Sequence, residues 1–379
     1  MMTHTNTSPT KDKAKYTIKQ IFIDHWHLFL IAYAYMNIRK AILINIDKIM
    51  KCQTKELGWS LFFCRTCERF KYVYHTCKSR FCNSCGIKYA KERAAAISKK
   101  CINCKHRHLV FTIPEELRDL FRKDRKLLNL LFKAASETLI GYFHNLNKTQ
   151  KYTPGIISVL HTFGRDMKWN PHIHVLCTEG GLGNIDVFKH ITHINYNALR
   201  RRWQAILLNM LEDALGKENF RVLKNMIYAK TQNGFYVRAK PNIKGKIKDG
   251  IKYIVRYTGR PVMAQSRIVN YDGKNVTFWY ERHEDGERVE ETISAFEFIK
   301  RLIIHIPDIG FKMIRYSGIY TSHKHKFYDK MILMFNKQQI YVLDTLNRWQ
   351  ASIMHDFKYN PLTCQYCNSK MELVEHQFP

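Results

Sequence analysis

The spacing of apolar residues changes several times along the chain, and each change predicts an element. Helices are predicted over residues 17–50, 115–145, 196–215 and 294–305, and in the first two the apolar positions recur at intervals typical of one helical face. Short apolar runs bounded by turn residues predict strands at 108–113, 156–163, 172–178, 267–271 and 275–280. A polar loop joins the second and third of these strands, which suggests an antiparallel pair. The chain is therefore expected to be α+β.

The distribution of cysteine, together with the predicted elements, divides the chain into four segments. Residues 1–50 form an N-terminal helical segment, and the composition then changes abruptly, because eight of the 11 cysteines lie within 51–105. Cys-x-x-Cys pairs in a chain of 379 residues favour reduced cysteines that hold metal over a disulfide framework. Residues 106–330 form the domain of strands and helices, and 331–379 form a basic tail that ends in Cys-x-x-Cys.

Charge narrows the choice of partner. The 62 Lys and Arg outnumber the 32 Asp and Glu, so that the net charge is +30. A polyanion is the expected partner, and nucleic acid is the commonest one. The alternative is that a basic composition reflects solubility or a ribosome-rich environment, and charge alone does not decide between the two interpretations. The most apolar run near the start, 27–36, is about half as long as a helix that spans a membrane. We therefore expect no interaction with a membrane.

The segment 161–176 carries the strongest candidate chemistry. Alternation about Ile173 places His172 and His174 on one face of a strand, with apolar neighbours on the other face. His161, on the neighbouring strand, is a candidate third ligand, and three imidazoles leave open positions on a divalent ion. Histidines satisfied within the core are the alternative interpretation. Hydrolases built on barrels also use His-x-His, but this chain lacks their repeated alternation of strand and helix.

A second feature is a predicted helix with tyrosines four residues apart on one face. Tyr253 and Tyr257 are flanked by three cations suited to phosphate, Lys252, Arg256 and Arg260. Chance packing is the alternative in a chain with 21 tyrosines. Attack of a phenol on phosphorus needs a polarised phosphate, which a divalent ion at the histidines would supply. Together the two features predict DNA cleavage through a 5′-phosphotyrosine.

The cysteines predict structural zinc. Two Cys-x-x-Cys pairs 15 residues apart indicate one four-cysteine site of Cys64, Cys67, Cys82 and Cys85. A possible second ion has an unassigned set of ligands drawn from Cys52, His75, Cys77, Cys101 and Cys104. The isolated pair Cys364 and Cys367 is either half of a zinc ribbon or a terminal turn. Basic and aromatic residues on the loops of the module suit DNA, among them Arg65, Lys78 and Arg80.

Four segments of the sequence resemble the IS91 family of insertion-sequence transposases: HTFGRDMKWNPHIHVLCTEGG, YIVRYTGRP, NVTFWY and GFKMIRYSGIY. These transposases are two-tyrosine members of the HUH endonuclease superfamily, in which U is a hydrophobic residue. The resemblance implies rolling-circle transposition of single-stranded DNA, a ferredoxin-like antiparallel sheet flanked by helices, and a zinc-binding domain before it. It also implies a Mg²⁺ or Mn²⁺ ion at the histidines.

Carried over by position, the resemblance makes His172 and His174 metal ligands and Tyr253 and Tyr257 nucleophiles. His161 matches the three-histidine arrangement of relaxases by its spacing, and Arg165 and Lys168 join the candidate DNA contacts. Gly58-Trp59 stands where IS91-like proteins often have Gly-His, a departure that bears on the second zinc site. The protein is then expected to act on the ends of a mobile element and on target DNA, in the cytoplasm of a bacterium and near its nucleoid.

Two other functions stay open at this point. A rolling-circle replication initiator would use the same chemistry but would cut an origin instead of the ends of an element. A zinc-dependent DNA-binding regulator would bind DNA without ever becoming covalently attached to it.

Overall fold

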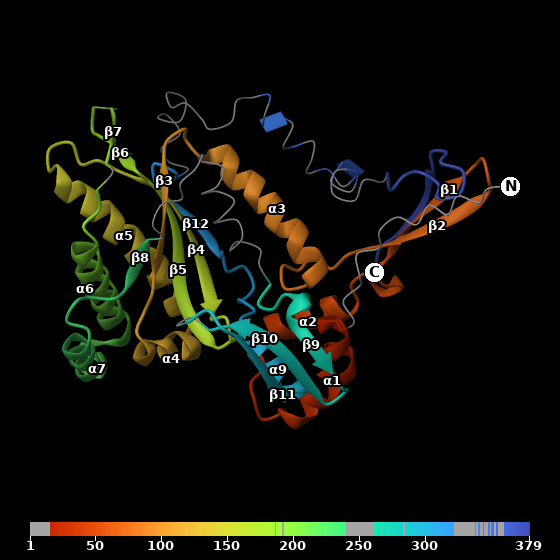
Figure 1. Cartoon of the computed structure of the whole chain (residues 1–379), viewed down its shortest axis with the longest axis horizontal. Helices are drawn as coiled ribbons and strands as arrows, with labels where there is room; N and C mark the ends of the chain where they lie inside the picture. Colours follow the sequence, from red (N-terminus) through yellow and green to blue (C-terminus); the bar gives the residue numbers. More distant parts are fainter. Residues whose placement is uncertain are drawn as a thin grey trace.

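The computed structural model describes residues 16–185, 187–191, 193–239, 261–282, 285–321 and 360–379, with single positions between 338 and 354. It has N-terminal helices followed by antiparallel sheets flanked by helices, which confirms the predicted α+β class (Figure 1). None of the helices in the described ranges has both the length and the apolar character that crossing a membrane requires.

A five-stranded antiparallel sheet carries the histidine segment. Its order is β12 (Ile314–Gly318), β4 (Gly155–Phe163), β5 (Trp169–Thr178), β3 (His106–Phe111) and β8 (Val237–Ala239). The pairing of β4 with β5 is the predicted antiparallel pair, and its register places His161 opposite His172. A short hairpin of β6 (Gly180–Leu182) and β7 (Phe188–His190) follows β5.

Helices cover one face of this sheet: α4 (Glu115–Lys123), α5 (Leu128–Leu146), α6 (Tyr196–Leu215) and α7 (Lys217–Lys230). Alternate residues of β5, such as Ile173 and Val175, are buried in the core beneath them. The single helix predicted over 115–145 is interrupted at Asp124. Its extended backbone ends α4, and its carboxylate accepts a hydrogen bond from the Lys126 N–H, which begins the short helix η2 (Arg125–Leu127).

The opposite face of the sheet carries the histidines. Successive side chains of a strand point to opposite faces, so His172 and His174 lie on the side of Leu176, away from the helical core. Leu176 packs there against Ile97 of α3 (Asn83–Lys100), a helix that was not predicted. Figure 1 shows α3 running from the cysteine-rich part of the chain to this sheet.

A second core joins segments more than 200 positions apart in the sequence. It is made by α1 (Ile18–Ala32) and α2 (Lys40–Met50) together with the meander β9 (Ile268–Tyr271), β10 (Asn275–Glu281) and β11 (Arg288–Ser294) and with α9 (Ala295–Ile303). The short helix η3 (Gln265–Arg267) precedes β9. The N-terminal helices thus share a core with the meander, a packing that the sequence did not predict. The helical pattern over 17–50 forms two helices, separated at residues 33–39.

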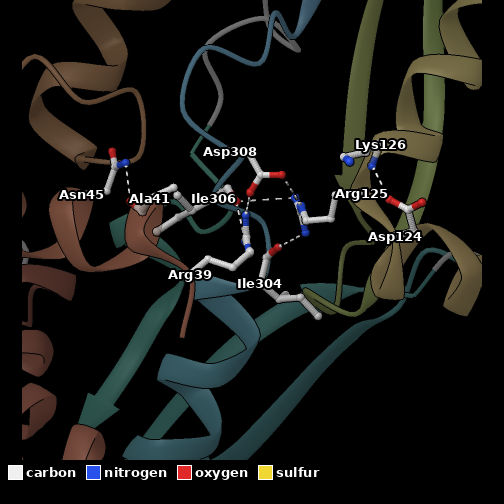
Figure 2. Close-up of polar contacts among 9 residues, drawn as sticks. All are labelled: Arg39, Ala41, Asn45, Asp124, Arg125, Lys126, Ile304, Ile306 and Asp308. Carbon is white, nitrogen blue, oxygen red and sulfur yellow. Dashed lines mark hydrogen bonds and ion pairs between the residues drawn. The ribbon is translucent and has the colours of Figure 1, made fainter. Parts of the chain in front are cut away.

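Polar contacts tie this second core to the main sheet (Figure 2). Arg39, at the start of α2, forms an ion pair with Asp308 and donates a hydrogen bond of 2.7 Å to the Ile306 carbonyl. Arg125 of η2 donates to the Ile304 carbonyl at 3.0 Å. Its guanidinium also lies 4.9 Å from the ring centre of Trp169, the first residue of β5.

A third sheet joins the C-terminal strand to the cysteine-rich segment. Its order is β13 (Glu372–Gln377), β1 (Trp59–Cys64) and β2 (Arg69–Tyr74), after the short helix η1 (Lys55–Leu57). Both pairings are antiparallel, and β1 is the central strand. The C-terminal strand therefore completes a sheet that begins in the cysteine-rich segment (Figure 1).

Candidate active site and metal centres

Three histidines converge on one point of the main sheet. Ligand nitrogens of His161, His172 and His174 all lie within 4.8 Å of one another. The two Nε2 atoms of His172 and His174 are 3.1 Å apart, and the His161 ring centre is 4.9 Å from that of His174. Hence the structure brings the three predicted ligands together, because the register of β4 and β5 sets His161 beside the His-x-His pair.

Hydrogen bonds orient two of these rings. Nδ1 of His172 lies 2.7 Å from the Asn170 carbonyl, which can only accept, so Nδ1 donates and Nε2 keeps its lone pair. Nδ1 of His174 lies 2.9 Å from Nε2 of His108, a buried residue of β3. His108 is a residue of the site that the sequence reasoning missed. The His106-x-His108 alternation on β3, placed next to β5, was the signal that could have found it.

Burial keeps the imidazoles neutral. It lowers the pKa of His172 to about 4, with the nearby Arg118 guanidinium contributing in the same direction. The pKa of His174 is held well below its usual value, by burial first and then by His172 and its other histidine neighbours. Neutral imidazole is the form that binds metal. His172 and His174 are therefore in the form that accepts a divalent ion at neutral pH.

The cysteines form two clusters, whose members differ from those of the predicted four-cysteine site and of the possible second site. Cys52, Cys77, Cys82 and Cys85 make one, and Cys64, Cys67, Cys364 and Cys367 make the other. The predicted grouping of Cys64 and Cys67 with Cys82 and Cys85 is thus corrected. The reason is tertiary, because β1 pairs with the C-terminal strand β13 and carries Cys64 towards Cys364 and Cys367.

The first cluster fits structural zinc. Neighbouring sulfurs lie 3.5 to 3.8 Å apart, far more than the roughly 2.05 Å of a disulfide bond. The pKa of the Cys82 thiol is lowered, chiefly by side-chain interactions with Cys52 and Cys77. Four cysteine sulfurs gathered in a largely buried cluster are the donor set that Zn²⁺ binds, as thiolates, in four-cysteine sites.

The other candidate zinc ligands lie elsewhere. Cys101 and Cys104 pack in the apolar core beside α3, and burial raises the pKa of each thiol to about 12, so both stay protonated. His75 makes hydrogen bonds with Ser60 at 3.0 Å and with the Leu57 carbonyl at 3.2 Å. Among the described residues none of these three belongs to a metal-binding cluster.

Comparison with known proteins decides the family. A family model described as a putative transposase matches residues 155–326, and a second, described as a transposase zinc-binding domain of IS91 type, matches residues 21–113. The transposase for insertion sequence element IS801, from Pseudomonas savastanoi pv. phaseolicola, is 31% identical over 295 residues, which are 73% of this chain and 70% of that protein. The chain belongs to the IS91 family of transposases.

A second relative supports the same assignment. The putative transposase y4qJ of Sinorhizobium fredii is 26% identical to this IS91-family transposase over 297 residues, 70% of this chain and 71% of that protein. No solved structure matches the chain. The match to the zinc-binding domain contains all four cysteines of the first cluster, and the match to the transposase domain contains the three histidines.

The predicted DNA contacts of this transposase occupy different environments. Arg165 and Lys168 lie in the loop between β4 and β5, where Arg165 pairs with Glu281 at 3.3 Å and Lys168 with Asp166 at 3.6 Å. Both side chains are more than half exposed. The loop thus presents two cations next to the histidine cluster.

The basic residues of the cysteine module differ more strongly in how exposed their side chains are. Lys78 is exposed, and Arg65 is 77% exposed although it pairs with Glu372 at 2.8 Å. Burial lowers the pKa of Arg80, whose guanidinium stacks 5.0 Å from the ring centre of Phe81. Arg80 is half-buried, and its contact with phosphate stays a prediction. The predicted nucleophiles Tyr253 and Tyr257, with Lys252, Arg256 and Arg260, lie outside the described residues.

Proposed function

We propose that this transposase nicks and rejoins single-stranded DNA in rolling-circle transposition, through a tyrosine that attacks a phosphate held at the histidine cluster. The observation that carries the proposal is the convergence of His161, His172 and His174, whose ligand nitrogens lie within 4.8 Å of one another, with His161 and His174 buried and His172 partly buried. A structural histidine cluster has no need to hold lone pairs towards a common point. In a site for an ion that binds phosphate, by contrast, the lone pairs of the ligand nitrogens must point towards the ion.

The donor set fits a divalent ion. His161, His172 and His174 would hold Mg²⁺ or Mn²⁺, which would neutralise a bound phosphate and polarise it for in-line attack. Between these two ions, three imidazole nitrogens favour Mn²⁺, because Mg²⁺ prefers oxygen ligands.

His108 acts in this proposal as a positioning residue. His174 Nδ1 and Nε2 of His108 are 2.9 Å apart, the two rings are stacked with centres 5.2 Å apart, and in this proposal Nδ1 of His174 is taken as the donor. This bond fixes the tautomer of His174 that leaves a lone pair on Nε2. Partners of this kind behind a ligating histidine orient its ring and raise its basicity.

Tyr253 or Tyr257 supplies the nucleophile. Its oxygen forms a bond to phosphorus as the bond to the 3′ oxygen breaks, which leaves a 5′-phosphotyrosine and a 3′ hydroxyl that takes up a proton. Since one phosphodiester replaces another, the bond can later be rejoined without ATP. Lys252, Arg256 and Arg260 lie next to these tyrosines in the sequence and would neutralise the phosphates on either side.

The cysteine module offers a surface for bases. Phe70, Tyr72 and Tyr74 alternate along β2, so they share one face, and they are 61%, 53% and 43% exposed. The rings of Tyr72 and Tyr74 are stacked, with centres 6.5 Å apart. Exposed aromatic rings beside cations bind single strands by stacking on bases. We therefore assign this face to single-stranded DNA at the end of the element.

Formation of the covalent bond tests the proposal. Wild-type protein with Mn²⁺ and a labelled single-stranded oligonucleotide from the end of the element should give an adduct that survives SDS. Tyr253→Phe combined with Tyr257→Phe should bind the same oligonucleotide and give no adduct. An undiminished adduct from the double variant would place the nucleophile elsewhere. An oligonucleotide from a plasmid origin separates transposition from replication initiation.

A further inference from the structure

Four cysteines, two from the cysteine-rich segment and two from the C-terminal segment, form a cluster that lies only partly within the zinc-binding domain. Sγ of Cys64 lies 3.4 Å from Sγ of Cys367, and Sγ of Cys67 lies 3.4 Å from Sγ of Cys364. All four sulfurs lie within 4.8 Å of one another. A tetrahedral zinc with Zn–S bonds of about 2.3 Å sets its sulfurs about 3.8 Å apart. The four sulfurs thus surround a space of the size that zinc requires.

The two halves of the cluster have the same backbone conformation. Glu68 follows Cys67 with φ of 52°, and Asn368 follows Cys367 with φ of 58°. Both lie in the left-handed region, which residues other than glycine seldom adopt. Of the six described residues other than glycine with positive φ, four directly follow a cluster cysteine, because Gln53 and Lys78 each follow a cysteine of the other cluster. A sharp turn after a ligating cysteine is therefore a repeated element of both sites.

The C-terminal turn is built to present its cysteines. The Cys364 N–H donates to the Ser369 carbonyl at 2.9 Å, and the Asn368 N–H donates to the Cys364 carbonyl at 3.0 Å. These bonds close a loop around the Cys364 to Cys367 pair. The turn that carries Cys64 and Cys67 is likewise closed, by the pairing of Cys64 with Arg69, where β1 passes into β2. Two such turns that face each other form the knuckles of a zinc ribbon.

Contacts between side chains hold the two ends in register. Arg65 pairs with Glu372 at 2.8 Å, and Lys71 donates to the Pro361 carbonyl at 3.0 Å. The apolar core beneath these contacts is small, however, with Phe62 and Met371 as its buried residues besides the cysteines Cys64 and Cys364. A core of this size rarely stabilises a fold without a disulfide or a metal. The sulfurs are too far apart for a disulfide, which leaves a metal.

We propose that Cys64, Cys67, Cys364 and Cys367 bind a second structural zinc, which closes a ribbon assembled from residues 59–74 and 361–377. The match to the zinc-binding domain ends at residue 113, so it includes only half of these ligands. The C-terminal segment is then part of the N-terminal module. The face of Phe70, Tyr72 and Tyr74 belongs to the same ribbon and depends on both ends of the chain.

Metal content tests this proposal without reference to cleavage. Full-length protein, expressed with added zinc, should contain two zinc ions per chain by elemental analysis. Cys364→Ser with Cys367→Ser should contain one, and Cys367→His, which keeps a ligand, should contain two. Cys101→Ser with Cys104→Ser is the matched control, because this Cys-x-x-Cys pair lies in neither cluster, and it should keep both ions. One zinc in the wild type, or two in the Cys364 and Cys367 double serine variant, would overturn the proposal.

Alkylation of the wild type gives a second measurement that needs no variant. Cys67 and Cys367 are partly exposed, so bound zinc is what should protect them from iodoacetamide. We expect both to be unlabelled in the zinc-loaded protein and to become labelled together when a chelator is added. Labelling of Cys367 before the chelator is added would refute the second site.

Discussion

Nε2 of His108 lies 2.9 Å from Nδ1 of His174, and both side chains are buried. The two residues are 66 positions apart in the chain and meet because β3 pairs with β5. His174 thus has one nitrogen directed towards His108 and the other towards His172, 3.1 Å away. The ring cannot turn without losing one of these contacts, which sets its orientation before any ligand arrives.

His108→Phe should weaken binding of Mn²⁺ about 10- to 100-fold while the protein stays folded. Phenylalanine keeps an aromatic ring in the buried position but cannot accept the hydrogen bond from His174. Titration of the metal-free protein with Mn²⁺, followed by electron paramagnetic resonance, measures the affinity. His190→Phe, at an exposed position on β7, is the control. Equal affinities for the two variants would show that His108 does not position His174.

His172→Ala with His174→Ala should abolish cleavage of single-stranded DNA and leave most of the DNA affinity intact. Two of the three ligands are lost, whereas the net charge of +30 that attracts phosphates is unchanged. An electrophoretic assay of cleavage, alongside binding by fluorescence anisotropy, separates the two effects. EDTA should reproduce the result with the wild type. Cleavage that continues in EDTA would exclude a role for a divalent ion.

Stability should fall as the pH falls from about 6.5 to about 4, and His305 should account for part of that loss. Its ring bonds to Thr162 at 3.1 Å and to the Met167 carbonyl at 2.8 Å, and it is stacked on Trp169. Burial lowers its pKa to about 4, with Arg125 acting in the same direction and Asp166 against it. The folded state therefore keeps His305 neutral in a range where the unfolded chain takes up a proton, and this favours unfolding.

Urea unfolding at about pH 7 and about pH 5 measures this effect. His305→Asn keeps hydrogen-bonding groups but does not titrate. The free energy of unfolding of this variant should therefore fall less from the higher to the lower pH than that of the wild type. The difference from wild type is expected to be on the order of 1 to 3 kcal/mol. Identical pH dependence in the two proteins would show that His305 is already neutral in the unfolded chain or charged in the fold.

Arg125→Ala should destabilise the protein by about 2–3 kcal/mol, and Asp308→Asn by less than about 1 kcal/mol. The Arg125 side chain is 9% exposed and donates to the Ile304 carbonyl, while Asp308 is 48% exposed, so solvent screens its ion pairs (Figure 2). Thermal unfolding of both variants gives the comparison. A larger effect of Asp308→Asn would mean that the ion pairs, and not the hydrogen bonds to carbonyls, join the two cores.

Phe70→Ala and Tyr72→Ala should each weaken binding of single-stranded DNA by about 1–3 kcal/mol, because each removes a ring on which a base can stack. Tyr228→Ala is a suitable control, since Tyr228 is 40% exposed on α7 and lies in a different part of the fold. Fluorescence anisotropy with an oligonucleotide from the end of the element measures the affinity. Equal losses in all three variants would indicate a general effect of exposed aromatic residues.

The sequence by itself determined the features that depend on short-range periodicity. Alternation placed His172 and His174 on one face of a strand, and the polar loop before them predicted the antiparallel partner that carries His161. The Cys-x-x-Cys spacing likewise predicted metal ligands, because two thiolates three positions apart can reach one ion. These relationships span few residues and need no knowledge of the rest of the chain.

Only the tertiary structure decided which distant residues meet. Pairing of β3 with β5 brought His108 to His174, and pairing of β1 with β13 divided the cysteines into two clusters, one of which joins Cys64 to Cys367 across 303 positions. A Cys-x-x-Cys turn has the same local form whichever partner completes its site, so spacing alone cannot choose between Cys82 and Cys364. The choice rests on which strands form hydrogen bonds with each other, and that is settled by packing over the whole chain.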